Sequence, residues 1–253
     1  MTERYYISVA PAADKEAIKT GFAWLIDQLQ KSPKPLTGLL CVPTISNLRG
    51  IITEVIGESA ANALAAGKAI SVPNSSNKIS LITSRKFNYG WQGGPILAAY
   101  PDKDILDKLD DMPGVTAILA VPWIMTHIQL WIDTWAPKNI RAPETSPIVN
   151  VKNPVVVEAL KSLTRRVNLS AGITHPLDRQ ATIDLFELLN SAGEKFDPNE
   201  VRAWLIREGK WSPKDADQVK AVAESILKGA RLRGRGRSWA DDIVEQWRTG
   251  TKL

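Results

Sequence analysis

Short apolar segments that alternate with helical patterns constrain the first half of this chain more than any other feature. Segments typical of buried strands lie at about residues 4–11, 37–45, 69–74, 78–87, 94–101 and 115–123. Helical spacing of apolar residues separates most of them, at about residues 13–32, 47–66, 102–112 and 124–135. Strands that are apolar throughout and separated by helices predict a mostly parallel sheet covered on both faces. The predicted fold class is therefore α/β.

Five of the strand segments end in a proline: Pro11, Pro43, Pro73, Pro101 and Pro122. Proline cannot donate to a sheet ladder, so it suits the point where a strand leaves its neighbours. We expect all five prolines to lie on one edge of the sheet, at the carboxyl ends of the strands. The alternation of strands and helices resembles Rossmann-like folds in general, and in open parallel sheets ligands bind beyond the carboxyl ends.

Hydroxyl, amide and aromatic side chains are frequent in the loops near these strand ends. Such groups orient small polar ligands, and we predict a ligand that is nucleotide-like or derived from a nucleotide. The competing interpretation is that Ser and Asn only terminate strands and cap helices. The predicted ligand-binding residues are Thr44, Ser46, Asn47, Asn74, Ser75, Tyr89, Trp91, Gln92, Gly93, Gly94 and Trp123.

The loop NYGWQGGP, residues 88–95, is the most unusual of these. Its glycines permit close backbone approach, and Tyr89 and Trp91 are able to stack on a flat ligand. A glycine-rich turn without a ligand explains the loop equally well.

Motifs that would assign a reaction are missing. The chain contains no G-x-G-x-x-G after its first strand, no G-x-x-x-x-G-K-[ST] and no G-x-S-x-G, so cofactor and catalytic residues stay unassigned and enzymatic activity stays open. No set of His, Cys and carboxylates suggests a metal site. His127 is expected to pack inside an apolar helix, and Cys41 to be a buried, unreactive thiol with a raised pKa. Asp110 and Asp111 are expected at the opposite edge of the sheet from the ligand.

The character of the sequence changes around residues 137–153, where proline is frequent and apolar periodicity is lost. We therefore predict an α/β domain at residues 1–137, a linker at 138–153 and a bundle of about five helices at 154–253. Three helix starts in the bundle carry an N-cap residue three positions before a carboxylate: Asp197, Ser212 and Ser238. His175 is expected to be a cap or a surface residue.

Positive charge is concentrated in the second part of the chain. Residues 1–137 hold 12 Lys and Arg and 12 Asp and Glu, whereas residues 138–253 hold 20 and 15. Glycines interrupt a run of arginines that leads into Trp239, namely Arg231, Arg233, Arg235 and Arg237. This run suggests an alternative function without catalysis, in which it binds nucleic acid or a protein partner. A solvated linker is the simpler interpretation.

The location of the protein is predicted from what the sequence lacks. The chain has one cysteine, no signal-like start and no apolar run long enough to span a bilayer. We therefore expect a cytoplasmic protein without a membrane partner, in which the helical domain regulates the α/β domain or docks a partner.

Overall fold

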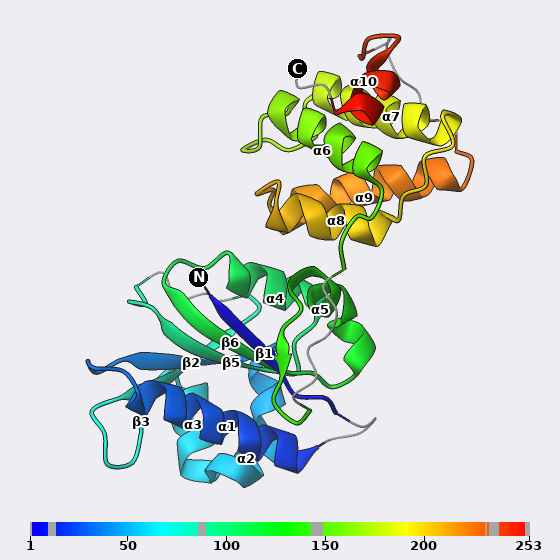
Figure 1. Ribbon diagram of the computed structural model, residues 1–253. Helices are drawn as coiled ribbons and strands as arrows, with labels where there is room; N and C mark the ends of the chain where they lie inside the picture. Colours follow the sequence, from blue (N-terminus) through cyan, green and yellow to red (C-terminus); the bar gives the residue numbers. More distant parts are fainter. Residues whose placement is uncertain are drawn as a thin grey trace. The chain divides into compact units, whose positions relative to one another are not determined.

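The computed structural model describes residues 2–9, 14–85, 90–142, 149–230, 232 and 238–250. The chain forms two compact units, one of residues 1–132 with 136–147 and one of residues 133–135 with 148–253. The first unit is an α/β domain and the second is all-helical, which confirms the predicted fold class (Figure 1).

A seven-stranded sheet forms the centre of the first unit, in the order β3-β4-β2-β5-β6-β1-β7. Every neighbouring pair is parallel except β3 with β4. The six predicted strands are present, and the seventh, β7, pairs through two residues with β1. The strands are β1 Glu3–Tyr6, β2 Thr37–Val42, β3 Ile70–Ser71, β4 Lys78–Thr83, β5 Gly94–Ala99, β6 Val115–Val121 and β7 Lys138–Asn139.

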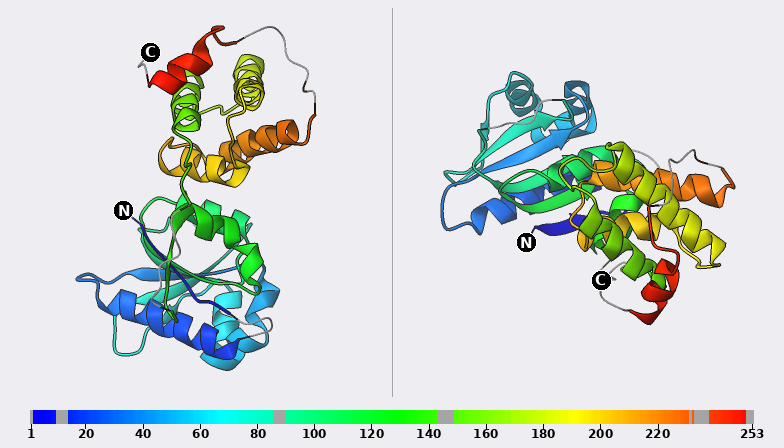
Figure 2. Two further views of the ribbon diagram at one scale, coloured as in Figure 1. Left: turned by 45° about the vertical axis from the view of Figure 1, so that its right-hand side comes forward. Right: turned by 90° about the horizontal axis from the view of Figure 1, so that it is seen from above.

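Helices cover both faces of this sheet. Figures 1 and 2 show α1 Lys15–Gln30, α2 Ile51–Ile56 and α3 Glu58–Ala65 on one face, and α4 Lys103–Asp110 and α5 Gln129–Trp135 on the other. Carboxylates cap two of them: Asp14 accepts from Ala17 N at 2.8 Å, and Asp102 accepts from Ile105 N at 2.8 Å. The predicted helix at 47–66 is divided into a short 3₁₀ turn, α2 and α3.

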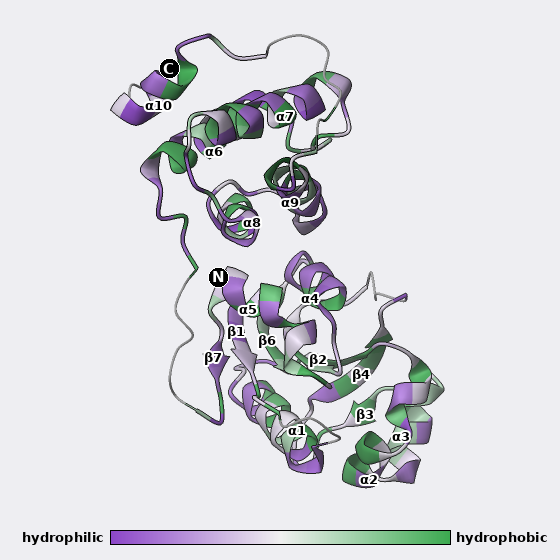
Figure 3. Ribbon diagram, turned by 90° about the vertical axis from the view of Figure 1, so that its right-hand side faces the viewer, coloured by the Kyte–Doolittle hydropathy of each residue, from purple (hydrophilic) through white to green (hydrophobic). Residues whose placement is uncertain are grey.

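The core of the α/β unit explains why its central strands, β2, β5 and β6, are mostly apolar. Leu40, Leu97 and Leu119, from three neighbouring strands, are fully buried in one cluster with Ile18 and Leu25 of α1. Figure 3 shows β2 and β4 in the green of apolar residues. Burial of each such side chain contributes about 1.5–3 kcal/mol, so the continuous apolar pattern identifies central strands well.

In its described residues, the helical unit has five helices around its own apolar core. Four of them begin with a cap residue followed by proline: α6 Pro154–Arg166 after Asn153, α7 Pro176–Ser191 after His175, α8 Pro198–Arg207 after Asp197, and α9 Pro213–Leu227 after Ser212. Proline is favourable there because the first helical N–H needs no partner within the helix. Within the described ranges, no helix is long and apolar enough to cross a membrane.

The predicted cap at Ser238 is wrong, although those at Asp197 and Ser212 are confirmed. The last helix, α10 Ile243–Thr249, starts after Asp242. Ser238 N instead donates to Asp184 Oδ2 at 2.7 Å, and the Trp239 indole lies edge-on to Trp247 with 5.7 Å between ring centroids. The start of α10 is therefore held by tertiary contacts of the preceding residues and not by a side-chain cap.

The prolines do not share one edge, as the sequence pattern suggested. Pro43, Pro101 and Pro122 follow β2, β5 and β6, which run parallel, so these three lie at the carboxyl edge. Pro73 follows β3, which pairs antiparallel with β4, and this places it at the amino edge of the parallel strands. Pro11 lies outside the described residues.

Candidate functional site

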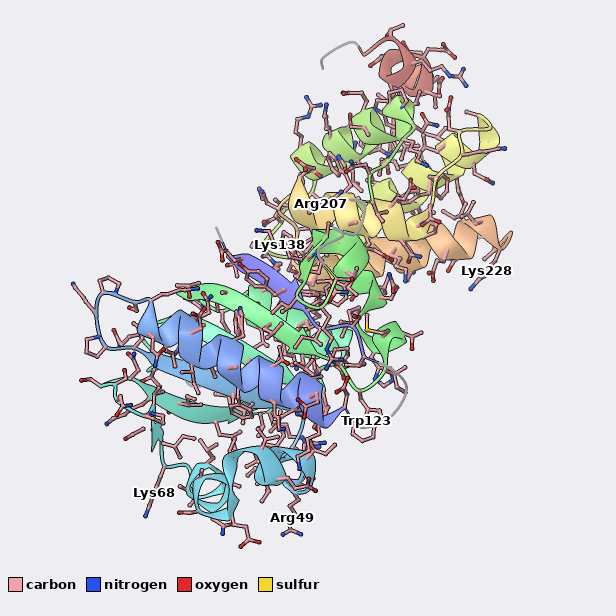
Figure 4. The ribbon with its side chains drawn as sticks, turned by 60° about the horizontal axis from the view of Figure 1, so that its bottom comes forward. Arg49, Lys68, Trp123, Lys138, Arg207 and Lys228 are labelled. Carbon is pink, nitrogen blue, oxygen red and sulfur yellow. The ribbon has the colours of Figure 1, made fainter. Side chains whose placement is uncertain are left out.

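A cavity of about 550 Å³ opens at the carboxyl edge of the sheet. Residues that follow β2, β5 and β6 supply its walls, together with the first turn of α4 and the short 3₁₀ turns after β2 and β6. Figure 4 shows the Trp123 side chain at this end of the sheet. The lining residues are Pro43, Asn47, Tyr100, Asp102, Lys103, Asp104, Trp123 and His127.

Tyr100 and Trp123 form the aromatic part of the cavity. Tyr100 directly follows the central strand β5 and has a φ of +59°, a left-handed conformation that is rare for a bulky side chain. Its N–H still donates to Val121 O at 2.8 Å, so the backbone stays in the sheet while its direction changes. The two rings meet edge to face, with centroids 5.2 Å apart and planes at 76°. Burial raises the pKa of the Tyr100 hydroxyl.

Charged residues at the start of α4 also line the cavity. Asp102 Oδ1 caps the helix through Ile105 N at 2.8 Å. Lys103 Nζ lies 2.9 Å from Asp104 Oδ1 and 3.0 Å from Asp107 Oδ2. The lining residues thus include two carboxylates, Asp102 and Asp104, and one lysine, Lys103.

The predicted residues Thr44, Ser46 and Asn47 lie at this edge but are largely occupied with one another. Asn47 Oδ1 accepts from Thr44 N at 2.9 Å and from Thr44 Oγ1 at 2.7 Å, and Thr44 Oγ1 lies 2.6 Å from Ser46 Oγ. Of these three, Asn47 lines the cavity. The structure thus brings Asn47 and Trp123 together, while Thr44 and Ser46 stabilise the turn.

Asn74 and Ser75 lie at the wrong edge of the sheet for this cavity. They connect β3 to β4, and the antiparallel direction of β3 carries them to the amino edge. There Ser75 Oγ accepts from Asn77 N at 3.1 Å, and Asn77 Oδ1 accepts from Leu36 N at 2.7 Å. Leu36 directly precedes β2, so these polar groups close a turn beside the start of a strand.

Trp91, Gln92, Gly93 and Gly94 are likewise at the amino edge, because they lead into β5. Gly94 is the first residue of that strand and pairs with Val115, the first residue of β6. Trp91 Nε1 donates to Thr37 O at 2.6 Å, at the start of β2. The error came from assigning the loop to the strand before it instead of the strand after it. Tyr89 lies outside the described residues.

Backbone packing accounts for a glycine at position 93. Its φ is +99°, and a Cβ atom there would lie 2.6 Å from Gly114 O. Gly114 itself has a φ of +81° and accepts from Gly94 N at 3.0 Å. The close approach of these two loops requires glycine on both sides.

Sequence reasoning missed Tyr100 and misread His127. In the sequence, Tyr100 is notable only because it precedes Pro101, and its neighbouring residues do not predict its positive φ. His127 was expected in the core of a helix, but it lies exposed in a 3₁₀ turn, Met125–His127, that precedes α5. The fully buried aromatic residue of this region is Trp131, whose Nε1 donates to Asp110 Oδ2 at 2.6 Å.

The predicted burial of Cys41 and the predicted position of Asp110 at the amino edge of the sheet are confirmed. Cys41 is buried, and burial together with the nearby charge of Asp102 raises the pKa of its thiol to about 12. Asp110 lies at the end of α4 that leads into β6, where Arg4 Nε pairs with Asp110 Oδ1 at 2.7 Å. Burial outweighs the Arg4 charge and raises the pKa of Asp110 to about 6. Neither residue lines the cavity.

The arginine run falls outside the described residues at each of its four arginines, Arg231, Arg233, Arg235 and Arg237. Two residues in and beside the run contact the helical unit. Leu232, between the first two arginines, packs against the apolar core, and Trp239, which follows the run, donates through Nε1 to Ala181 O at 2.8 Å.

Residues 152–248, fewer than half of the chain, match a family described as a domain of unknown function (DUF1889). This match coincides with the helical unit. No curated protein and no solved structure shows significant similarity to the chain.

Proposed function

We propose that the α/β unit binds a small polar ligand with a planar ring, such as a nucleoside, at the carboxyl edge of its sheet. The binding site in this proposal is the cavity between Tyr100, Trp123 and His127. Asn47 supplies an amide at its rim. Its volume of about 550 Å³ lies within the range of known small-molecule pockets, about 300–1,000 Å³.

The observation that carries this proposal is the left-handed backbone of Tyr100. Such a conformation costs about 1–3 kcal/mol in a residue other than glycine, and strain of this kind concentrates at functional sites. Here it turns the chain at the end of β5 so that the Tyr100 ring lines the cavity beside Trp123. The same ring also packs against the apolar core of the α/β unit.

The exposure of Trp123 supports the same proposal. Its ring is 44% exposed, whereas Trp131 in the following helix is fully buried. A half-exposed indole beside an exposed His127 offers a stacking face and a hydrogen-bonding group to a flat polar molecule.

In the same proposal the helical unit is a docking or regulatory module. Its match to a domain of unknown function supplies no activity. The alternative function, binding of nucleic acid or a protein partner through the arginine run, is supported by the charge excess of residues 138–253.

A screen of nucleosides, nucleotides and other small metabolites by thermal shift tests the ligand proposal on the full chain. A ligand at 100 times its Kd adds about 2.7 kcal/mol of stability. We expect Trp123→Ala to abolish the shift and to leave the stability of the free protein nearly unchanged, because the ring is half exposed.

The matched control is Trp91→Phe, which removes an indole from the amino edge. The lost hydrogen bond to Thr37 O lowers stability by about 1 kcal/mol and leaves affinity unchanged. A ligand whose affinity follows Trp91 and not Trp123 contradicts the proposed site.

The alternative is tested by replacing Arg231, Arg233, Arg235 and Arg237 with alanine. If the run contacts phosphates, binding of a short oligonucleotide is lost, and the slope of log K against log[salt] becomes shallower by at most about 4. An absence of oligonucleotide binding at low salt eliminates nucleic acid as the partner.

A further inference from the structure

The cavity at the carboxyl edge has an unbalanced charge. Asp104 and Asp107 share the ammonium group of Lys103, at 2.9 and 3.0 Å. Asp102 forms no ion pair with any described residue, and its Oδ1 accepts from Ile105 N at 2.8 Å. One carboxylate on the cavity wall is therefore left without a cation.

This arrangement is unfavourable for a phosphate. The free backbone N–H groups at the start of α4 would be the natural anion site of the cavity, but the Asp102 carboxylate already occupies that position. Asp102 also contributes to the raised pKa of Cys41, so its negative charge reaches the end of β2. An anionic ligand would be repelled at the point where other α/β folds bind phosphate.

The aromatic wall has the opposite preference. The negative faces of indole and phenol rings attract a cation that lies within about 6 Å of the ring centroid. Because the Tyr100 and Trp123 planes are inclined at 76°, the two rings bound a corner instead of a flat slot. A compact charged group that enters this corner lies near both rings.

We propose that the ligand of this cavity carries an ammonium or guanidinium group, which pairs with the Asp102 carboxylate and lies against the Tyr100 and Trp123 rings. This inference rests on the proposed function and specifies the chemical class of its ligand. Carboxylate and rings belong to the lining of one cavity, and Asp102 follows Tyr100 by two residues.

The test compares cations with neutral molecules of the same shape, by calorimetry and tryptophan fluorescence on the full chain. Choline is compared with 3,3-dimethylbutan-1-ol, and butylguanidine with butylurea; adenosine and AMP are added as a neutral and an anionic ring ligand. We expect at least one cation to bind tenfold or more tightly than its neutral counterpart, and AMP to bind more weakly than adenosine.

The decisive variant is Asp102→Asn, because asparagine caps a helix as well as aspartate does and removes only the charge. We expect it to weaken binding of the cation tenfold or more and to leave adenosine unaffected. Asp111→Asn, at the other end of α4, is the matched control. We expect it to leave the affinities for the cation and for adenosine unchanged.

The failure of this inference differs from the failure of the proposed function. Binding of adenosine or AMP through Trp123, with cations no better than their neutral counterparts, overturns the cationic class and retains the site. If neither cations nor ring ligands bind, or if Trp123→Ala leaves their binding unaltered, both proposals are overturned.

Discussion

Similar residue types occur at the two edges of the sheet, but they make different contacts at each edge. At the amino edge, Trp91 and Asn77 bond to backbone groups of the strand starts, and Gly93 packs against Gly114. At the carboxyl edge, Trp123 is half exposed and lines a cavity. Tryptophan, glycine and amide residues near a strand end thus indicate a loop with special geometry. At the amino edge that geometry serves packing, whereas at the carboxyl edge it borders a cavity.

The largest expected effect concerns the amino edge. Gly93→Ala combines a positive φ with a Cβ atom 2.6 Å from Gly114 O, a contact with backbone that cannot simply move aside. We expect a loss of about 3 kcal/mol or more in the free energy of unfolding, measured by denaturant titration.

Gly67→Ala is the control for this loss. Gly67 has a similar φ of +75°, but an added Cβ meets no atom within 4 Å, so only about 1 kcal/mol of backbone strain is expected. Equal losses in the two variants would mean that the loop at Gly93 has room, and the packing account of this glycine would then be wrong.

Alanine substitutions of two asparagines, Asn77 at the amino edge and Asn47 at the carboxyl edge, compare the two edges through smaller expected losses of stability. Asn77 is 6% exposed and holds two backbone groups, Leu36 N at 2.7 Å and Leu29 O at 2.9 Å. We expect Asn77→Ala to cost about 2–4 kcal/mol, because it leaves buried backbone groups unsatisfied. Asn47→Ala, at the exposed turn of the carboxyl edge, should cost about 1 kcal/mol or less. A larger loss of stability in Asn47→Ala than in Asn77→Ala would mean that the polar contacts of the carboxyl edge contribute more to the stability of the fold.

The smallest expected effect is the pH dependence from Asp110. Its pKa of about 6 lies above the unfolded value, so its stabilising contribution is present at low pH and is lost as the pH rises through about 6. Between pH 7 and pH 5 this group should add about 1 kcal/mol of stability. Asp110→Asn should remove that increment, as seen in the difference between the two pH–stability curves. Parallel curves would mean that Arg4 holds the carboxylate ionised.

Apolar patterning predicted the fold class because burial leaves the same signal in every central strand. It failed where the signal is short or non-local. The two-residue strand Lys138–Asn139 buries too little to be recognised, and the reversed direction of Ile70–Ser71 depends on its pairing with Lys78 and Ile79. Local cap chemistry predicted Asp197 and Ser212, yet it failed at Ser238, where a distant carboxylate, Asp184, binds the backbone instead.

The candidate site was predictable in outline only. That it lies beyond the strand ends follows from the general behaviour of parallel sheets, and Asn47 and Trp123 follow from it. The roles of Tyr100 and His127 in the cavity could not be predicted in this way. The position of Tyr100 depends on its positive φ, and that of His127 depends on where α5 begins.

Both outermost strands of the sheet, β3 and β7, are only two residues long. An exposed strand margin is a template on which another chain can extend the ladder, and its hazard grows with its length. Such brief margins themselves offer a second molecule almost no backbone to pair with. In the ladders of the described residues, however, β3 covers only Lys78 and Ile79 of β4, so the remaining four residues of β4 have a partner strand on the β2 side alone. The backbone open to strand addition at this margin therefore belongs to β4 and not to β3.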